Sequence, residues 1–101
     1  PPDAIFVANN LMTLGALLAL RERGVRVPDD VALVGFDDMP WSAEFRSPLT
    51  AVSQPTYELG QEAVHLLRRR LAQPDAPVRT VVLNTRLIVR ESCGAALKLR
   101  R

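Results

Sequence analysis

The chain has 101 residues, of which 48% are hydrophobic and 24% charged, an ordinary balance for one small globular domain. Its longest apolar run, Leu14–Leu20, is far shorter than the roughly 20 residues that a membrane helix needs. The first residues lack the basic and apolar regions of a signal peptide, and the net charge of +2 comes from a basic excess concentrated at Arg68–Arg70 and Lys98–Arg101.

The first third of the chain predicts two buried strands joined by a helix. The apolar run Ala4–Ala8 is typical of a buried strand, and a second such run covers Val31–Phe36. Between them we expect a helix over Leu11–Arg23, with an asparagine, Asn9 or Asn10, in front of it as a suitable N-cap. Two buried strands joined by a helix form a βαβ unit, so these strands should be parallel.

This first helix is apolar on nearly every side. Leu11, Leu14 and Leu18 form one stripe. Leu17 and Leu20 form another. A helix of this kind must be covered on more than one side. One sheet covers a single face, so the other face needs a second layer or a second subunit.

The remaining strands are predicted to be short. Residues 37–48 show little periodicity and should form a loop, with one helical turn at most. We expect strands over Leu49–Ser53, Val78–Leu83 and Leu87–Arg90. Beyond Ser92 the chain is expected to be a frayed tail.

A second helix is predicted over Pro55–Ala72, because proline suits the first helical turn and Pro74 ends the pattern. Its buried stripe should contain Leu59, Ala63, Leu67 and Leu71, with Val64 beside them. Three consecutive arginines, Arg68–Arg70, fan over the surface of this helix and cannot form one nucleic-acid-reading face. They are interpreted as a solvated helix end.

Polar side chains follow the first two predicted strands. Ligands of open α/β sheets bind outside the carboxyl ends of the strands, where Asn9 and Asp37 should lie. A carboxylate accepts hydrogen bonds from neighbouring hydroxyls, and an amide both donates and accepts, which suits a sugar or a nucleoside. We therefore predict that Asn9 and Asp37 bind a ligand. Asn10 is interpreted as a helix cap, and Asp38 as a turn residue.

Catalysis is the less favoured alternative. Asp37 and Asp38 could hold Mg²⁺, and Ser42, His65 and an aspartate could be imagined as a triad. However, the chain has no G-x-S-x-G, G-x-G-x-x-G or P-loop pattern. Cys93 is the only cysteine, so an internal disulfide is impossible and nothing indicates an oxidising compartment. We expect no enzyme activity, no cofactor and no metal site.

Six segments of the chain, in order, resemble the LacI/GalR family of transcription regulators. They are Val7–Met12, Leu14–Leu17, Arg23–Val31, Val34–Asp38, Pro48–Pro55 and Leu87–Ser92. Each segment alone is weak evidence for the resemblance, but the six segments together are specific to the family. One departure is Asn10, because the family usually has aspartate at that position.

The resemblance implies an α/β fold with parallel-sheet βαβ layers, of the periplasmic-binding-protein-like type I kind, incomplete in this chain. Residues 1–53 would belong to the C-terminal effector subdomain and residues 54–84 to the N-terminal one. Residues 85–92 would return to the C-terminal subdomain, and residues 93–101 would be the tail. Gln54 and Asn84 would then lie at hinge crossings between the subdomains.

The resemblance also implies that the chain is the effector-binding and dimerisation portion of a cytoplasmic regulator. The effector would be a sugar or a similar small polar molecule. The implied ligand-binding residues are Asn9, Asp37 and Gln54. The implied homodimer contacts are Leu14, Leu17, Leu18, Trp41 and Phe45. Stacking of Trp41 on the ligand is an alternative.

Operator DNA would be bound only through an N-terminal helix-turn-helix, which is not part of this sequence. The alternative function from a similar fold is a sugar-binding protein of a transport system.

Overall fold

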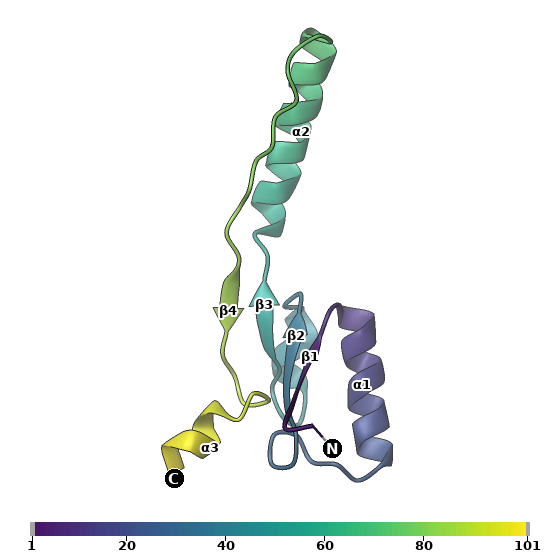
Figure 1. Ribbon diagram of the computed structural model, residues 1–101, viewed down its shortest axis with the longest axis vertical. Helices are drawn as coiled ribbons and strands as arrows, with labels where there is room; N and C mark the ends of the chain where they lie inside the picture. Colours follow the sequence, from purple (N-terminus) through teal and green to yellow (C-terminus); the bar gives the residue numbers. More distant parts are fainter. Residues whose placement is uncertain (1, 101) are drawn as a thin grey trace. The chain divides into compact units, whose positions relative to one another are not determined.

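The computed structural model describes residues 2–100 of the chain, and for residues 98–100 it describes the backbone alone. Two compact units are present (Figure 1). The sheet unit comprises residues 1–53 and 86–101, and the helix unit comprises residues 54–85. Arg101, the end of the expected tail, lies outside the described residues.

The sheet unit is built around one four-stranded sheet with the strand order β1-β2-β3-β4. Its elements are β1 (Ala4–Val7), α1 (Asn10–Glu22), β2 (Ala32–Phe36), the 3₁₀ helix η1 (Pro40–Glu44), β3 (Thr50–Ser53), β4 (Arg86–Ile88) and α3 (Ala95–Arg100). The first three strands are parallel, and β4 is antiparallel to β3. The predicted βαβ unit and the helical turn in the loop after β2 are therefore confirmed.

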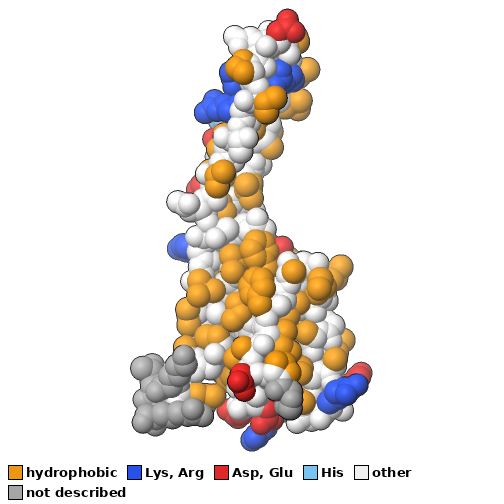
Figure 2. Space-filling model, viewed as in Figure 1, with side chains coloured by type: hydrophobic (Ala, Val, Ile, Leu, Met, Phe, Trp, Pro, Cys, Tyr) orange, Lys and Arg blue, Asp and Glu red, His pale blue; other side chains and the backbone are white. Residues whose placement is uncertain are grey.

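The core of the sheet unit lies on one side of the sheet, against α1. Val7, Leu33, Leu49 and Ala51 form its buried cluster. Because strand side chains alternate between faces, Phe6 points away from this cluster and is 62% exposed. The prediction that this segment is a buried strand is therefore wrong in its burial, because only Val7 of the four β1 residues is buried. Figure 2 shows hydrophobic side chains over much of the visible face of this unit.

Helix α1 packs on the sheet with one face only. Thr13 is its one fully buried residue, and Leu17 is half-buried in contact with the core. The stripe residues Leu11 and Leu18 stay exposed, at 77% and 57%. This matches the expectation that one sheet cannot cover a helix that is apolar nearly all round.

The helix unit consists of α2 (Thr56–Ala72) and the extended segment that follows it. The helix begins at Thr56, one residue later than predicted, and Pro55 is its N-cap. Its predicted stripe is not buried, however: Leu67 is 57% and Leu71 72% exposed. An amphipathic helix buries its stripe only against a second element, and the described residues after α2 leave most of the stripe exposed.

The prediction of a strand over Val78–Leu83 is wrong. These residues run extended but pair with no other strand in the described part of the chain. Val78 and Val82 are 89% and 83% exposed. Residues with strand propensity form a strand only where a neighbouring strand pairs with them through hydrogen bonds. The composition of this segment was therefore not enough to predict a strand.

The chain after Ser92 is also more regular than expected. A short helix, α3, covers Ala95–Arg100 where a frayed tail was predicted. Gly94 precedes it with a positive φ of 78°, a conformation that glycine adopts without strain. Among the described residues, no helix is both long enough and apolar enough to cross a membrane.

Candidate functional site

Two predicted ligand-binding residues lie at the same edge of the sheet unit. Asn9 follows β1, and Asp37 follows β2, which is the neighbouring parallel strand. The strands β1 and β2 run side by side (Figure 1), and parallel strands end at the same edge of a sheet, so both residues follow that edge. Gln54, the third predicted residue, directly follows β3 and is the first residue of the helix unit.

Asn9 is the N-cap of α1. Its Oδ1 accepts a hydrogen bond from the Met12 N–H at 2.9 Å. Its backbone carbonyl accepts from the Thr13 hydroxyl at 2.8 Å, and Thr13 is fully buried. Capping engages only the amide oxygen, so the NH₂ group is the part of Asn9 best suited to a ligand.

Asn10 lies within α1 and not at the N-cap position that was predicted for it. It is the first residue of α1, and its Oδ1 accepts from the adjacent Leu11 N–H at 2.9 Å. The prediction that Asn10 caps the helix is therefore wrong, because the extended backbone of Asn9, with φ −158° and ψ 172°, is what an N-cap requires.

Asp37 has an unusual backbone. Its φ is +78°, and among the described residues it is the only one other than glycine with a positive φ. Aspartate tolerates this left-handed conformation better than most residues. Its N–H donates to the Val52 carbonyl at 3.0 Å, which extends the β2–β3 ladder by one bond. The half-buried Asp37 is thus held at the sheet edge by its own backbone.

Asp38 forms an ion pair with Arg90. The Nη1 of Arg90 lies 2.7 Å from Oδ1 of Asp38, and Nη2 lies 3.1 Å from Oδ2. Both side chains are mostly shielded, at 21% and 18% exposure. The hydrogen bonds from Arg90 hold the pKa of Asp38 below its ordinary value, although burial opposes the shift. Asp38 is therefore more than the turn residue that was predicted.

Arg90 was not singled out from the sequence. Its guanidinium also donates to the Leu49 carbonyl at 2.7 Å, so the group binds three oxygen atoms. The hydrogen bond to Asp38 raises the pKa of Arg90. The available signal was an arginine at the end of the apolar run Leu87–Val89, where a charge needs a partner.

The segment around Arg90 is joined to the sheet by buried hydrogen bonds. The Arg90 N–H donates to Thr50 Oγ1 at 2.9 Å, and the Thr50 N–H donates to Ser92 Oγ at 2.8 Å. The Ser92 hydroxyl donates in turn to the Leu33 carbonyl at 2.6 Å. Thr50 and Ser92 are at most 1% exposed. Buried polar groups paired in this way hold the segment in one position.

Four of the five predicted dimer residues line one groove on the sheet unit. These are Leu14, Leu17, Leu18 and Phe45. The groove has a volume of about 790 Å³ and runs between α1 and the loop after η1. The fifth residue, Trp41, packs edge-to-face on the ring of Phe45, with 5.4 Å between the ring centroids. The structure thus gathers these residues on one surface.

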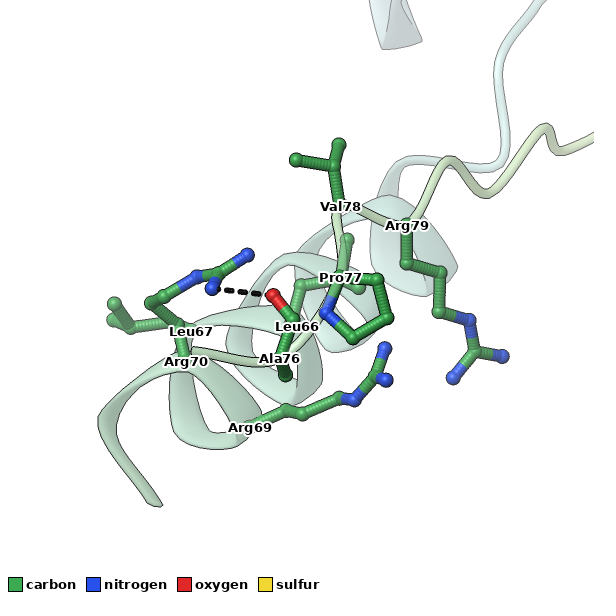
Figure 3. A pocket seen from close by; sticks show the side chains of 8 residues that line it. All are labelled: Leu66, Leu67, Arg69, Arg70, Ala76, Pro77, Val78 and Arg79. Carbon is green, nitrogen blue, oxygen red and sulfur yellow. Dashed lines mark hydrogen bonds between the residues drawn. The ribbon is translucent and has the colours of Figure 1, made fainter. Parts of the chain in front are cut away.

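A smaller cavity of about 260 Å³ lies within the helix unit (Figure 3). Leu66, Leu67, Arg69 and Arg70 of α2 line it, together with residues 76–79. The Nη1 of Arg70 donates to the carbonyls of Pro74 and Ala76 at 2.8 and 2.7 Å. Arg70 therefore binds the chain after α2, although it stays exposed to solvent as was predicted for this helix end.

The imagined catalytic serine has a structural position. Ser42 is fully buried, and its hydroxyl accepts from the Met39 N–H at 3.0 Å. Ser42 also contributes, less than Arg90, to lowering the pKa of Asp38. Within the described residues, no three histidine, cysteine, aspartate or glutamate side chains are grouped as a metal site would require.

Comparison with known proteins identifies the family. The model of the periplasmic binding protein-like domain matches residues 1–93. The chain belongs to this family. The predicted fold class, an incomplete periplasmic-binding-protein-like α/β fold, is confirmed, and so is the resemblance to LacI-type regulators.

The similar proteins of this family are regulators. The HTH-type transcriptional regulator CelR of Thermobifida fusca is 48% identical over 91 residues, covering 89% of this chain and 26% of that protein. The HTH-type transcriptional repressor PurR of Mannheimia succiniciproducens is 41% identical over 91 residues, covering 90% and 27%. This periplasmic binding protein-like chain spans about a quarter of the length of these relatives.

A solved structure supports the same assignment. The structure described as a transcriptional regulator CelR–cellobiose complex matches with a TM-score of 0.82 and 46% identity. The match covers 89% of this chain and 28% of that one. The division of this periplasmic binding protein-like chain between two subdomains stays a prediction.

Proposed function

We propose that this chain is the effector-binding and dimerisation portion of a LacI-type transcription regulator. The observation that carries the proposal is the pair Asn9 and Asp37, placed by neighbouring parallel strands at one sheet edge. An amide and a carboxylate in this position suit a molecule that offers several hydroxyl groups. Gln54, which directly follows β3, is proposed to assist them.

A sugar is the proposed effector. The CelR structure that resembles this chain contains cellobiose, which supports the ligand class and not the individual sugar. Asp37 would accept hydrogen bonds from sugar hydroxyls. Hydrogen bonds to a charged group contribute about 1.5–3 kcal/mol. Loss of the carboxylate should therefore weaken binding roughly 10- to 150-fold.

Titration calorimetry tests this proposal on the full regulator that carries the chain. The probes are cellobiose and a panel of other mono- and disaccharides. Asp37→Ala should weaken binding by the stated factor, whereas Asp75→Ala, which removes an exposed carboxylate from the helix unit, should leave it unchanged. Equal affinity of the Asp37→Ala variant and the unsubstituted protein would remove Asp37 from the site.

The groove beside α1 is proposed as the contact with a second copy of the chain. Leu14 and Leu18 are exposed in it at 36% and 57%, and Phe45 also lines it. Exposed apolar surface of this kind is typical of an interface. In a two-fold dimer the same surface occurs on both sides. The packing of Trp41 on Phe45 supports the interface role over stacking of Trp41 on the ligand.

A regulator is favoured over the sugar-binding protein of a transport system, because the relatives described above are HTH-type regulators. Operator DNA would be bound through a helix-turn-helix in a segment other than this one, and the regulator would act in the cytoplasm. This chain alone should then bind DNA weakly, with an affinity that falls steeply with salt. A salt-resistant, sequence-selective gel shift with this chain alone would contradict that assignment.

A further inference from the structure

Arg90 makes more hydrogen bonds than an ordinary surface ion pair needs, through both its backbone and its side chain. Its N–H binds the buried Thr50 hydroxyl, which ties the Arg90 backbone to β3. Its guanidinium then reaches the Leu49 carbonyl and both carboxylate oxygens of Asp38. Backbone and side chain are thus both held, so the guanidinium has one defined position relative to the sheet.

The contact between Arg90 and Asp38 suits arginine in particular. The planar fork of the guanidinium matches a carboxylate with two parallel hydrogen bonds, which a lysine ammonium cannot do. Both side chains are about four-fifths shielded from solvent, which weakens the screening that makes exposed ion pairs ineffective.

This contact lies next to the proposed ligand-binding residue. Asp37 precedes Asp38 directly and has the left-handed φ of +78°. Such a conformation in a residue other than glycine persists only where the surroundings impose it. Two anchors do so here: the Asp37 N–H binds the Val52 carbonyl, and the Asp38 carboxylate binds Arg90. The hydrogen bond to Val52 holds the chain just before the backbone torsions of Asp37, and the ion pair with Arg90 holds it just after them.

We propose that Arg90 is a positioning residue for effector binding, because it holds the Asp37–Asp38 turn in the conformation that presents Asp37 to the effector. This inference rests on the proposed function. Arg90 contacts no effector itself and acts through Asp38. The consequence is that a side chain 53 positions after Asp37 in the sequence determines how well Asp37 binds.

The first test measures the turn without any ligand. In the full regulator, amide hydrogen exchange is compared for Asp37, whose N–H binds Val52, and for Thr13, whose N–H binds Asn9. Arg90→Met should raise the exchange rate at Asp37 about tenfold with little change at Thr13. The control Arg86→Met removes an exposed arginine from β4 and should change neither rate. Equal changes at Asp37 and Thr13, or no change at Asp37, would overturn the proposal.

The second test measures binding of cellobiose by calorimetry. Arg90→Met should weaken affinity about tenfold. Arg90→Lys should weaken it less, because lysine keeps the positive charge but lacks the planar guanidinium that binds both oxygens of Asp38. In an Asp37→Ala background, Arg90→Met should cause no further loss, since its effect runs through Asp37. Additive losses would show that Arg90 affects binding independently of Asp37 and would overturn the proposal. If Arg90→Met does not fold, Arg90→Lys and Asp38→Asn provide the same comparisons.

These tests separate the two proposals. If the unsubstituted regulator binds neither cellobiose nor any other sugar of the panel, the proposed effector class is wrong. Hydrogen exchange at Asp37 then still decides whether Arg90 positions the turn.

Discussion

The guanidinium of Arg90 binds both carboxylate oxygens of Asp38, at 2.7 and 3.1 Å, although 52 positions separate the two residues. Asp38 follows β2, and Arg90 follows β4, so the ion pair ties the last strand of the sheet to the loop that contains Asp37. This link has consequences for stability, for binding and for the dependence of both on pH.

Stability of the sheet unit should fall in acid because of Asp38. The pKa of this carboxyl is lowered in the folded protein, chiefly by the hydrogen bonds from Arg90. A lowered pKa gives stability that is fully present above the unfolded value of 3.8 and is lost as pH falls through the folded pKa. Urea unfolding from neutral pH to below that value should show the decline.

The Asp38→Asn variant isolates this contribution. It should be less stable at neutral pH, by roughly 1–3 kcal/mol, and its stability should vary less with pH in acid. Asp30→Asn is the matched control, because Asp30 pairs with Arg26 in a more exposed bridge, with side chains 40% and 71% exposed, that salt and water screen. An acid dependence that is identical in Asp38→Asn and the unsubstituted protein would exclude the ion pair as its source.

The backbone of Asp37 predicts an order of stability among its variants. Asp37→Gly should be more stable than Asp37→Ala by about 1 kcal/mol, because alanine is strained at positive φ and glycine is not. Both variants lack the carboxylate and should bind sugar equally poorly. Urea denaturation gives the first comparison, and calorimetry the second. Greater stability of the alanine variant would indicate that the turn relaxes out of the left-handed region.

Ser92→Ala should destabilise the sheet unit by about 1–3 kcal/mol. The substitution removes the hydroxyl that accepts from the Thr50 N–H and donates to the Leu33 carbonyl, and it leaves both groups buried without that partner. Ser47→Ala is the control, because within residues 2–100 the buried hydroxyl of Ser47 has no hydrogen-bond partner. Equal losses for the two variants in chemical denaturation would contradict the role assigned to Ser92.

Assembly is predicted to depend on the groove beside α1. Leu14→Ala and Phe45→Ala should each shift the full regulator toward the monomer in light scattering at low micromolar concentration, because each shortens one wall of the groove. Leu11→Ala is the control, since Leu11 is 77% exposed on the same helix and does not line the groove. Intact dimers in both groove variants would place the contact elsewhere, and a monomeric unsubstituted regulator would exclude it.

The sequence by itself determined the βαβ unit and the placement of Asn9 and Asp37. Strand, helix, turn and strand follow from local properties, namely apolar periodicity, capping residues and loop composition. The rule that ligands bind at the carboxyl ends of parallel strands then directs attention to the residues after β1 and β2. These inferences need no knowledge of which distant residues meet.

Only the tertiary structure decided the features that depend on a partner. Residues 78–83 have strand composition but form no strand, because a ladder needs a second chain segment to accept its hydrogen bonds. The apolar stripe of α2 is likewise exposed, because burial of a stripe also needs a second element that packs against it. The role of Asp38 was invisible in the sequence because Arg90, which defines it, reaches Asp38 only when β3 and β4 pair. Local sequence patterns determine where helices and strands form. Contacts between residues far apart in the sequence determine which side chains are held in place.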